Sequence, residues 1–339
     1  MEWRPLTRRT GKVLFFTACS IAGVFSISTV LAAWFMVKPS KKEYDCIPRI
    51  SGSRLEPLTL TTSDGLQLHA WVQLSRRSNS NNWVILLHGY RSDREVLQTR
   101  RRFFTRRGYH TLLLHFRGHG SSEAARISYG YHERKDIKAA FDFIRALNPG
   151  QPVRIGIDGV SMGAAAAVYA AAYESIKPDW MILESCYDNI RQALTNRLEL
   201  HVVRPFVPII AWPLEFVAEH LFQLHLEELD VVRALTRIRC PVLILAGDSE
   251  KVLKTAEVEL MYKSIPKPKH LIFFPGAGHE DLLVRDPRRY IRGVSRFLRK
   301  FAPLLPATQE STSSHLSIAE KTVEKSNVEE WKHGLQPRA

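Results

Sequence analysis

The chain has 339 residues, a formal net charge of +14 and an apolar fraction of 45%. That apolar fraction is enough for a sizeable core and excludes a wholly disordered chain. The basic excess favours anionic surfaces such as phospholipid head groups or nucleic acid, but no motif that reads nucleic acid accompanies it, so we expect no nucleic-acid partner.

An uncharged apolar run over residues 13–37 follows a basic N-terminal flank over residues 1–12. About 25 residues span about 30 Å of hydrocarbon, and peptide groups in lipid need internal partners, so we expect a single transmembrane helix. A small excess of cations on the N-terminal side predicts a cytoplasmic N-terminus and a soluble domain on the non-cytoplasmic side. A cleaved signal peptide ending near Val30, Ala32 and Ala33 is the alternative; the length of the run favours an uncleaved signal anchor.

After a linker over residues 38–57, short apolar runs alternate with amphipathic stretches as far as residue 302. The runs expected as strands are 58–62, 66–74, 83–87, 111–116, 154–158, 179–183, 242–246 and 271–274. The stretches expected as helices are 93–107, 133–147, 162–174 and 287–301. Apolar strands alternating with helices predict an α/β fold with a mostly parallel central sheet flanked by helices. In 93–107 we expect the arginines to form a solvated face over Phe103 and Phe104.

Two regions break this alternation. Residues 189–238 form a long insertion between two expected strands, and its centre places Pro205, Pro208 and Pro213 among bulky apolar residues. A long insertion at this level of a sheet usually covers a site, so we expect a lid. Residues 303–339 are polar and rich in Ser, Thr, Glu and Lys, which predicts a disordered tail.

Residues 159–163 read G-V-S-M-G, a G-x-S-x-G pattern between an expected strand and an expected helix. A nucleophile elbow requires that strand–turn–helix setting, because the turn exposes a serine hydroxyl above the sheet edge. We therefore predict Ser161 as a nucleophile. The backbone N–H groups of Met162 and of Tyr90, which follows the strand 83–87, are the predicted halves of an oxyanion hole. The neighbouring His88 is expected to be a buried histidine that orients its loop.

A serine nucleophile needs a base and an acid that come later in the chain. His279 lies in a loop after the last expected strand, which is the position of a triad histidine in this chain order. The loop after strand 242–246 carries two carboxylates, Asp248 and Glu250, and either one would fix the imidazole tautomer and stabilise its protonated form. Glu184, at the end of strand 179–183, is a third candidate acid.

Together these residues resemble the α/β-hydrolase superfamily, and more narrowly its monoacylglycerol-lipase-like and serine-aminopeptidase-like branch. The resemblance covers residues 58–301 and includes R-G-H-G-S-S at 117–122, which is similar to an R-G-H-G-x-S stretch of the family. His115 stands where the family usually has Asp, which affects no catalytic position. The acid of the family usually lies three residues after the glycine that ends its strand; that position is Glu250, so the resemblance favours Glu250 over Asp248.

The predicted reaction is acyl transfer to water through an acyl-enzyme on Ser161. We expect neither a metal nor a nucleotide cofactor, because H-E-x-x-H, Walker A and G-x-G-x-x-G sequences are absent. An ester of a lipid or another apolar acyl group is the expected substrate, because the apolar segment 203–216 is suited to an acyl pocket near a bilayer. Peptidase or thioesterase action at the same residues, and an inactive hydrolase fold that serves as a binding module, are the alternatives. The sequence does not define an oligomeric state.

Overall fold

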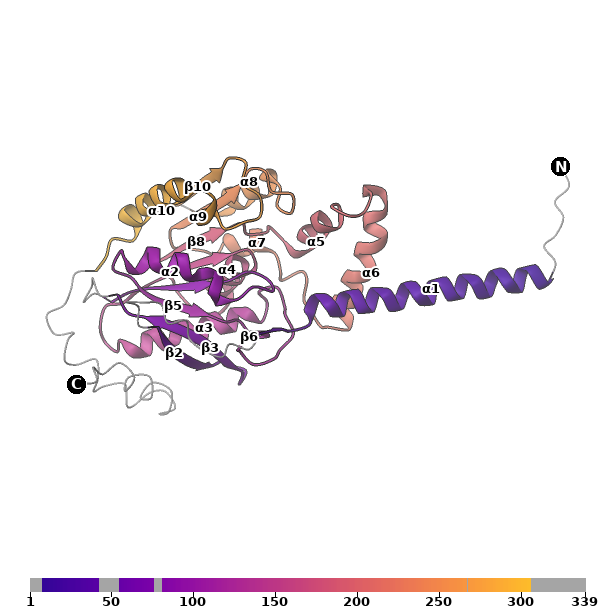
Figure 1. Cartoon of the computed structure of the whole chain (residues 1–339), viewed down its shortest axis with the longest axis horizontal. Helices are drawn as coiled ribbons and strands as arrows, with labels where there is room; N and C mark the ends of the chain where they lie inside the picture. Colours follow the sequence, from indigo (N-terminus) through magenta and orange to yellow (C-terminus); the bar gives the residue numbers. More distant parts are fainter. Residues whose placement is uncertain (1–7, 43–54, 76–80, 267, 306–339) are drawn as a thin grey trace.

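The computed structural model describes residues 8–42, 55–75, 81–266 and 268–305, and its centre is an eight-stranded sheet (Figure 1). The strand order is β10-β9-β8-β7-β4-β5-β3-β2; the strands from β10 to β5 are parallel, and β3 is antiparallel to both of its neighbours. The strands are β2 (Glu56–Thr61), β3 (Gln67–Gln73), β4 (Asn82–Leu87), β5 (His110–Leu114), β7 (Arg154–Val160), β8 (Trp180–Glu184), β9 (Val242–Gly247) and β10 (Lys269–Phe274). Every strand expected from the sequence overlaps one of these, so the predicted α/β fold with a mostly parallel sheet is confirmed.

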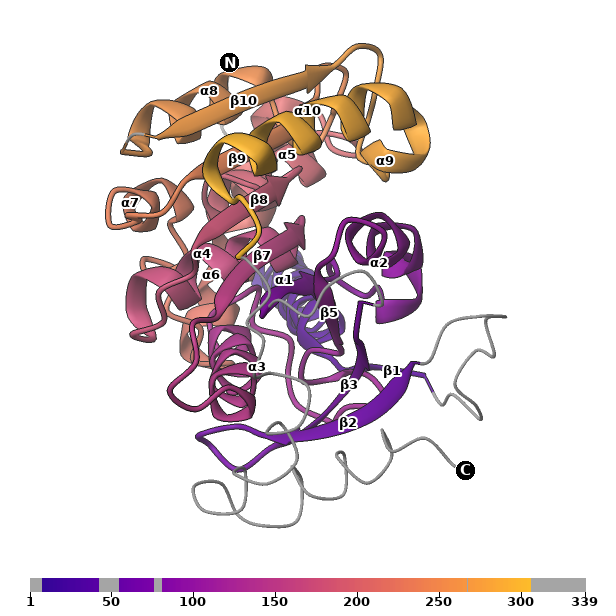
Figure 2. The ribbon, with the colours of Figure 1, turned by 90° about the vertical axis from the view of Figure 1, so that its left-hand side faces the viewer.

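Helices cover both faces of the sheet (Figure 2). Successive side chains of a strand point to opposite faces, and in β4 Trp83, Ile85 and Leu87 join one hydrophobic core while Val84 and Leu86 join the other. The first core also contains side chains of α3 (Glu133–Leu147) and α4 (Met162–Tyr173), and the second those of α2 (Gln98–Thr105), α9 (Leu282–Arg285) and α10 (Pro287–Phe301). Further along the chain from β9 lies α8 (Thr255–Ser264).

The prediction that the arginines of α2 form a solvated face is wrong for two residues. Arg100 and Arg101 are each 1% exposed, whereas Arg102 and Arg106 are exposed as expected. Buried charges need hydrogen-bonding partners, because an unpaired charge is costly to remove from water. Arg101 Nε donates to the side chain of Gln98 at 2.7 Å, and Arg100 meets a group of carboxylates described below. The first turn of the expected helix is the 3₁₀ segment η1 (Arg94–Leu97).

The N-terminal apolar run forms one long helix, α1 (Arg8–Val37), which projects from one end of the domain (Figure 1). Residues 16–37 of α1 are long and apolar enough to cross a membrane. At the domain end, Ile127 N–H donates to Val37 C=O at 2.8 Å. The apolar N-terminal helix of the prediction is therefore present, and its C-terminal end is bonded to the domain.

The R-G-H-G stretch also attaches to the end of α1. Two residues within the expected linker, β1 (Ser40–Lys41), pair in parallel with β6 (His119–Gly120). Arg117 holds this loop in place through ion pairs with Asp64 at 2.8 Å and Asp136 at 2.7 Å. The first part of the expected linker is thus part of the domain; residues 43–54 lie outside the described residues.

The insertion over 189–238 is largely helical. It contains α5 (Ile190–Leu198), η2 (Arg204–Phe206), α6 (Val207–His220) and α7 (Val231–Leu235). Pro208 lies in the first turn of α6, where a missing N–H costs nothing, but Pro213 lies inside the helix. α6 packs against α1 and α5. Most of the expected tail, residues 306–339, lies outside the described part of the chain.

Candidate active site

Ser161 lies at a sharp turn between the end of β7 and the start of α4. Its backbone has φ 53° and ψ −117°, a conformation that non-glycine residues rarely adopt. Strained backbone of this kind is typical of functional sites. The flanking glycines make the turn possible. A Cβ on Gly163 would lie 2.6 Å from His88 O, and one on Gly159 would lie 2.7 Å from Ala164 N. The pattern G-x-S-x-G therefore reflects close backbone contacts on both sides of the serine.

The structure brings Ser161, His279 and Glu250 into one line of hydrogen bonds. His279 Nε2 lies 3.1 Å from Ser161 Oγ, and His279 Nδ1 lies 2.8 Å from Glu250 Oε2. The residues come from the loops after β7, β10 and β9, whose carboxyl ends share one edge of the parallel sheet. With Nδ1–H donating to the carboxylate, Nε2 is free to accept the serine proton, which is the geometry of a nucleophile, a base and an orienting acid.

Of the two candidate carboxylates on the loop after β9, Glu250 contacts the histidine. Its side chain is buried, and its second oxygen accepts hydrogen bonds from Ser185 Oγ and from Gly247 N–H. Asp248 is exposed and accepts the N–H of Gly276 at 2.8 Å, so it orders the neighbouring loop. Ser185 was not identified from the sequence, where a single serine after a strand carries no distinguishing signal.

The loop that follows β4 lies directly beside the serine. A Cβ on Gly89 would lie 3.5 Å from Ser161 Cβ, which places the Gly89–Tyr90 backbone against the elbow. Burial lowers the pKa of His88 to about 3, so its imidazole is neutral and hydrogen-bonds to Gly89 O at 2.8 Å. Met162 is the first residue of α4, and the first N–H groups of a helix have no acceptor within the helix.

Two cavities meet at Ser161. The apolar cavity, about 300 Å³, is lined by Tyr129 and Tyr187 from the domain, by Leu214 from α6, and by the last turn of α1. The second cavity, about 390 Å³, lies on the side of His279. Arg197 of α5 lines both cavities. Both volumes lie at the lower end of the range for small-molecule sites, about 300–1,000 Å³.

Comparisons with known proteins agree with this architecture. A family model described as "Serine aminopeptidase, S33" matches residues 78–221. Protein Rv2307c of Mycobacterium tuberculosis is 25% identical over 248 residues, covering 73% of this chain and 80% of its own length. The membrane protein YNL320W of Saccharomyces cerevisiae is 21% identical over 290 residues, covering 84% of this chain and 94% of its own. The solved structure of esterase Pf2001 from Pyrococcus furiosus matches with a TM-score of 0.64 at 23% identity, covering 78% of this chain and 99% of that one.

The chain belongs to the α/β-hydrolase superfamily. Within it, the matching family model places the chain in the serine-aminopeptidase-like branch. The matched range contains Ser161 and Tyr90 but neither Glu250 nor His279. The association of those two residues with the serine of this α/β-hydrolase therefore rests on the measured distances.

The third candidate acid of the hydrolase, Glu184, contacts a different partner. Its Oε1 accepts from Arg100 at 2.6 Å and from Leu282 N–H at 3.1 Å. Arg100 also pairs with Asp158 and Asp281, each at 3.2 Å. Burial raises the pKa of Glu184 to about 7, although the charge of Arg100 opposes that rise. This buried group ties the ends of β7 and β8 to the chain that follows His279.

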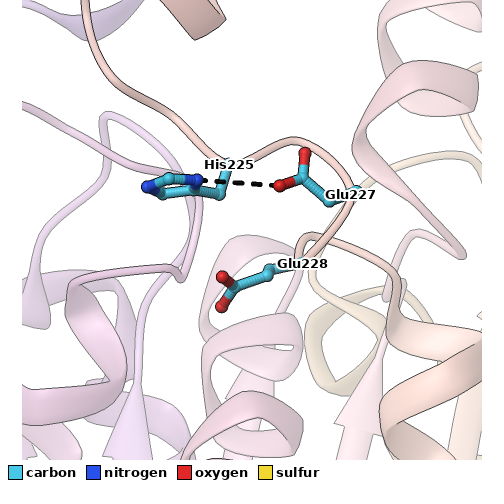
Figure 3. Close-up of side chains that lie close together, drawn as sticks. All are labelled: His225, Glu227 and Glu228. Carbon is cyan, nitrogen blue, oxygen red and sulfur yellow. Dashed lines mark ion pairs between the residues drawn. The ribbon is translucent and has the colours of Figure 1, made fainter.

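One further cluster in the described residues has donor atoms suited to a metal. His225, Glu227 and Glu228 lie close together on the insertion of the hydrolase (Figure 3), with His225 Nδ1 3.6 Å from Glu227 Oε1. All three are exposed, and none lines either cavity at Ser161. Exposed acidic groups of this kind are common without an ion, so we assign the cluster no role; the absence of a cofactor stays a prediction.

Proposed function

We propose that this protein is a membrane-anchored serine hydrolase that cleaves a carboxylic ester of an apolar acyl group through an acyl-enzyme. The observation that carries the proposal is the hydrogen-bonded line from Ser161 through His279 to Glu250, at a strained turn. Such an arrangement on this fold supports nucleophilic acyl transfer.

In the proposed reaction, His279 Nε2 removes the proton of Ser161 as Oγ attacks the ester carbonyl. The negative oxygen of the tetrahedral intermediate accepts from the N–H groups of Tyr90 and Met162. When the intermediate collapses, the imidazolium gives its proton to the leaving alcohol, and Glu250 stabilises the imidazolium until then. Water, deprotonated by His279, then attacks the acyl-enzyme and releases the acid and the free serine.

The lining of the apolar cavity supports an ester with an apolar acyl group. An aminopeptidase substrate would bring an ammonium group, which needs a carboxylate acceptor close to the scissile bond. Three carboxylates line the two cavities in the described part of the chain, and each is already paired with an arginine: Glu215 with Arg191, Glu280 with Arg285, and Asp281 with Arg100. The Pyrococcus protein of similar fold is likewise an esterase. Peptidase and thioesterase action are the competing activities that an assay of matched substrates distinguishes.

Membrane anchoring is part of the proposal and is supported by α1. Residues 16–37 are long and apolar enough to span a bilayer, and the yeast relative is named a membrane protein. We propose an uncleaved anchor, a cytoplasmic N-terminus and a domain on the other side. Protease added to sealed vesicles tests the orientation: digestion of the domain only from the cytoplasmic side would contradict it.

A fluorophosphonate probe tests the nucleophile in the folded full-length protein. We expect labelling of the wild type, loss of labelling in Ser161→Ala, and retained labelling in Ser249→Ala, which removes an exposed hydroxyl that bonds to Asp248. An unlabelled wild type would instead support the inactive binding module. A series of esters, thioesters and amides with matched acyl groups then identifies the bond that is cleaved.

A further inference from the structure

The last turn of α1 forms a wall of the apolar cavity that reaches Ser161. Ala33, Met36 and Val37 line the cavity, and their i, i+3, i+4 spacing places them on one helix face. Ala33 and Val37 are each 3% exposed, whereas Leu31 is 59% and Trp34 51% exposed. Part of the proposed acyl site therefore belongs to the helix that is proposed to span the membrane.

Hydrogen bonds hold this wall in place against the elbow. The carbonyl of Met36 lies in the last turn of α1, where carbonyls lack an N–H partner within the helix. It accepts instead from Tyr90 Oη at 2.7 Å and from Tyr129 Oη at 3.1 Å. Tyr90 is also the residue whose N–H is proposed for the oxyanion hole. The end of the anchor is thus bonded both to the loop beside Ser161 and to the side of the apolar cavity.

A further part of the cavity lining comes from α6, which has two different faces. Leu214 and Ala218 line the cavity, whereas large apolar side chains on the other faces are exposed. The exposed fractions are 59% for Ile209 and 69% for Trp212, and Phe206, directly before α6, is 58% exposed. An apolar surface of this kind marks a contact with something other than water.

The position of α6 indicates that this contact is the bilayer. α6 packs against α1 and crosses its domain end steeply in Figure 1, so α6 lies roughly along the membrane surface when α1 spans it. Trp34 of α1 and Trp212 of α6 are both exposed, and Nζ of Lys38, the residue directly after α1, lies 4.2 Å from the ring centre of Phe35. Tryptophan and cations at the ends of spans are typical of the membrane–water interface.

We infer that α1 and α6 together form an entrance from the bilayer, through which a long-chain acyl ester held in the membrane reaches Ser161 with its acyl chain against Ala33, Met36 and Val37. The inference rests on the proposed function and adds the substrate class, its route and the residues that select it. The anchoring helix is then also a specificity-determining element.

Chain-length selectivity of the full-length protein in phosphatidylcholine vesicles tests the inference. The measured quantity is the ratio of kcat/KM for a palmitoyl ester to kcat/KM for the butyryl ester of the same alcohol. Ala33→Trp should lower the ratio at least about tenfold, since each methylene excluded from an apolar pocket costs about tenfold or more. Leu31→Trp, on the exposed face of the same helix, should leave it within about twofold. An unchanged ratio in Ala33→Trp, or an equal fall in both variants, overturns the inference.

A binding measurement separates this inference from the catalytic proposal. In the Ser161→Ala background, a palmitoyl ester with a photoreactive diazirine at the chain end should form an adduct on Tyr187, a buried residue of the domain that lines the cavity. Ala33→Trp should remove this adduct and Leu31→Trp should retain it. Adducts that form without hydrolysis by the wild type refute the proposed function alone. Absence of the Tyr187 adduct in a protein that hydrolyses butyryl esters refutes the entrance alone.

Discussion

The role of Glu250 leads to a prediction that the geometry makes quantitative. In Glu250→Gln, the two donors that face Oε1, Ser185 Oγ–H and Gly247 N–H, favour the amide oxygen at that position. The amide NH₂ then points at His279 Nδ1, which lies 2.8 Å from the other carboxylate oxygen. Because Nδ1 then faces a hydrogen-bond donor, it must act as an acceptor, and the imidazole carries its own proton on Nε2. An Nε2 that already carries a proton cannot take the proton of Ser161.

The expected loss is therefore that of a histidine held in the wrong tautomer, about 10⁴-fold in kcat or about 5 kcal/mol of transition-state stabilisation. Glu250→Asp keeps the charge but withdraws the carboxylate by about one C–C bond, 1.5 Å. The contact with Nδ1 then exceeds hydrogen-bond range, about 3.2 Å, and we expect an intermediate loss of about 10- to 100-fold. Asp248→Asn is the matched control and should stay within about threefold.

Ester hydrolysis by the three variants, with active sites counted by a fluorophosphonate and folding checked by thermal unfolding, measures these effects. Folded Glu250→Gln that keeps more than a tenth of the wild-type kcat would refute the tautomer argument. If Asp248→Asn lost activity as strongly as Glu250→Gln, the hydrogen bond to Gly276 would matter as much as the triad contact, and the assignment of the acid would be wrong.

Three further predictions concern the support beneath the site. Gly163→Ala should lower the free energy of unfolding by about 1–3 kcal/mol in urea, because its Cβ would press on two backbone oxygens; an unchanged value would show that α4 shifts freely. Arg100→Met should cost about 3–5 kcal/mol in the same assay, because Asp158 and Glu184 lose their buried counter-charge. Burial raises the pKa of Glu184 from 4.5 to about 7, so the native state binds this proton more tightly and wild-type stability falls as pH rises between those values. The free energy of unfolding of Glu184→Gln, minus that of the wild type, should therefore rise from pH 5 to pH 8. A fall in this difference would contradict the raised pKa of Glu184.

The sheet could be predicted because its signals are local. Strands buried on both faces appear as continuous apolar runs, and amphipathic stretches such as that of α3 lie between them. Ser161 and His279 could be chosen because a G-x-S-x-G turn and a histidine after the last strand follow the chain order of this fold. The choice of Glu250 over Asp248 came from a resemblance, and the distances in the structure agree with that choice.

The remaining features depend on contacts that spacing does not encode. Charge patterning assigned Arg100 to solvent, because its three carboxylate partners lie far away in the sequence. The sequence predicted a lid over 189–238 but not its helices, and α6 runs through Pro213 while it packs against α1. The share of α1 in the cavity could not be inferred either, because an apolar residue that faces lipid and one that faces a cavity look the same in sequence.

The end of β8 connects the separate parts of the site, although it supplies none of its three reacting groups. Ser161 N–H donates to Glu184 C=O at 2.8 Å, while the Glu184 side chain binds Leu282 N–H, three residues beyond His279. The next residue, Ser185, donates its hydroxyl to Glu250. β8 lies in the sheet between β7, which precedes Ser161, and β9, which precedes Glu250, so two consecutive residues at its end can reach all three loops. As a carboxylate at a strand end, Glu184 was a candidate acid; its contacts instead join the serine turn to the segment that follows His279.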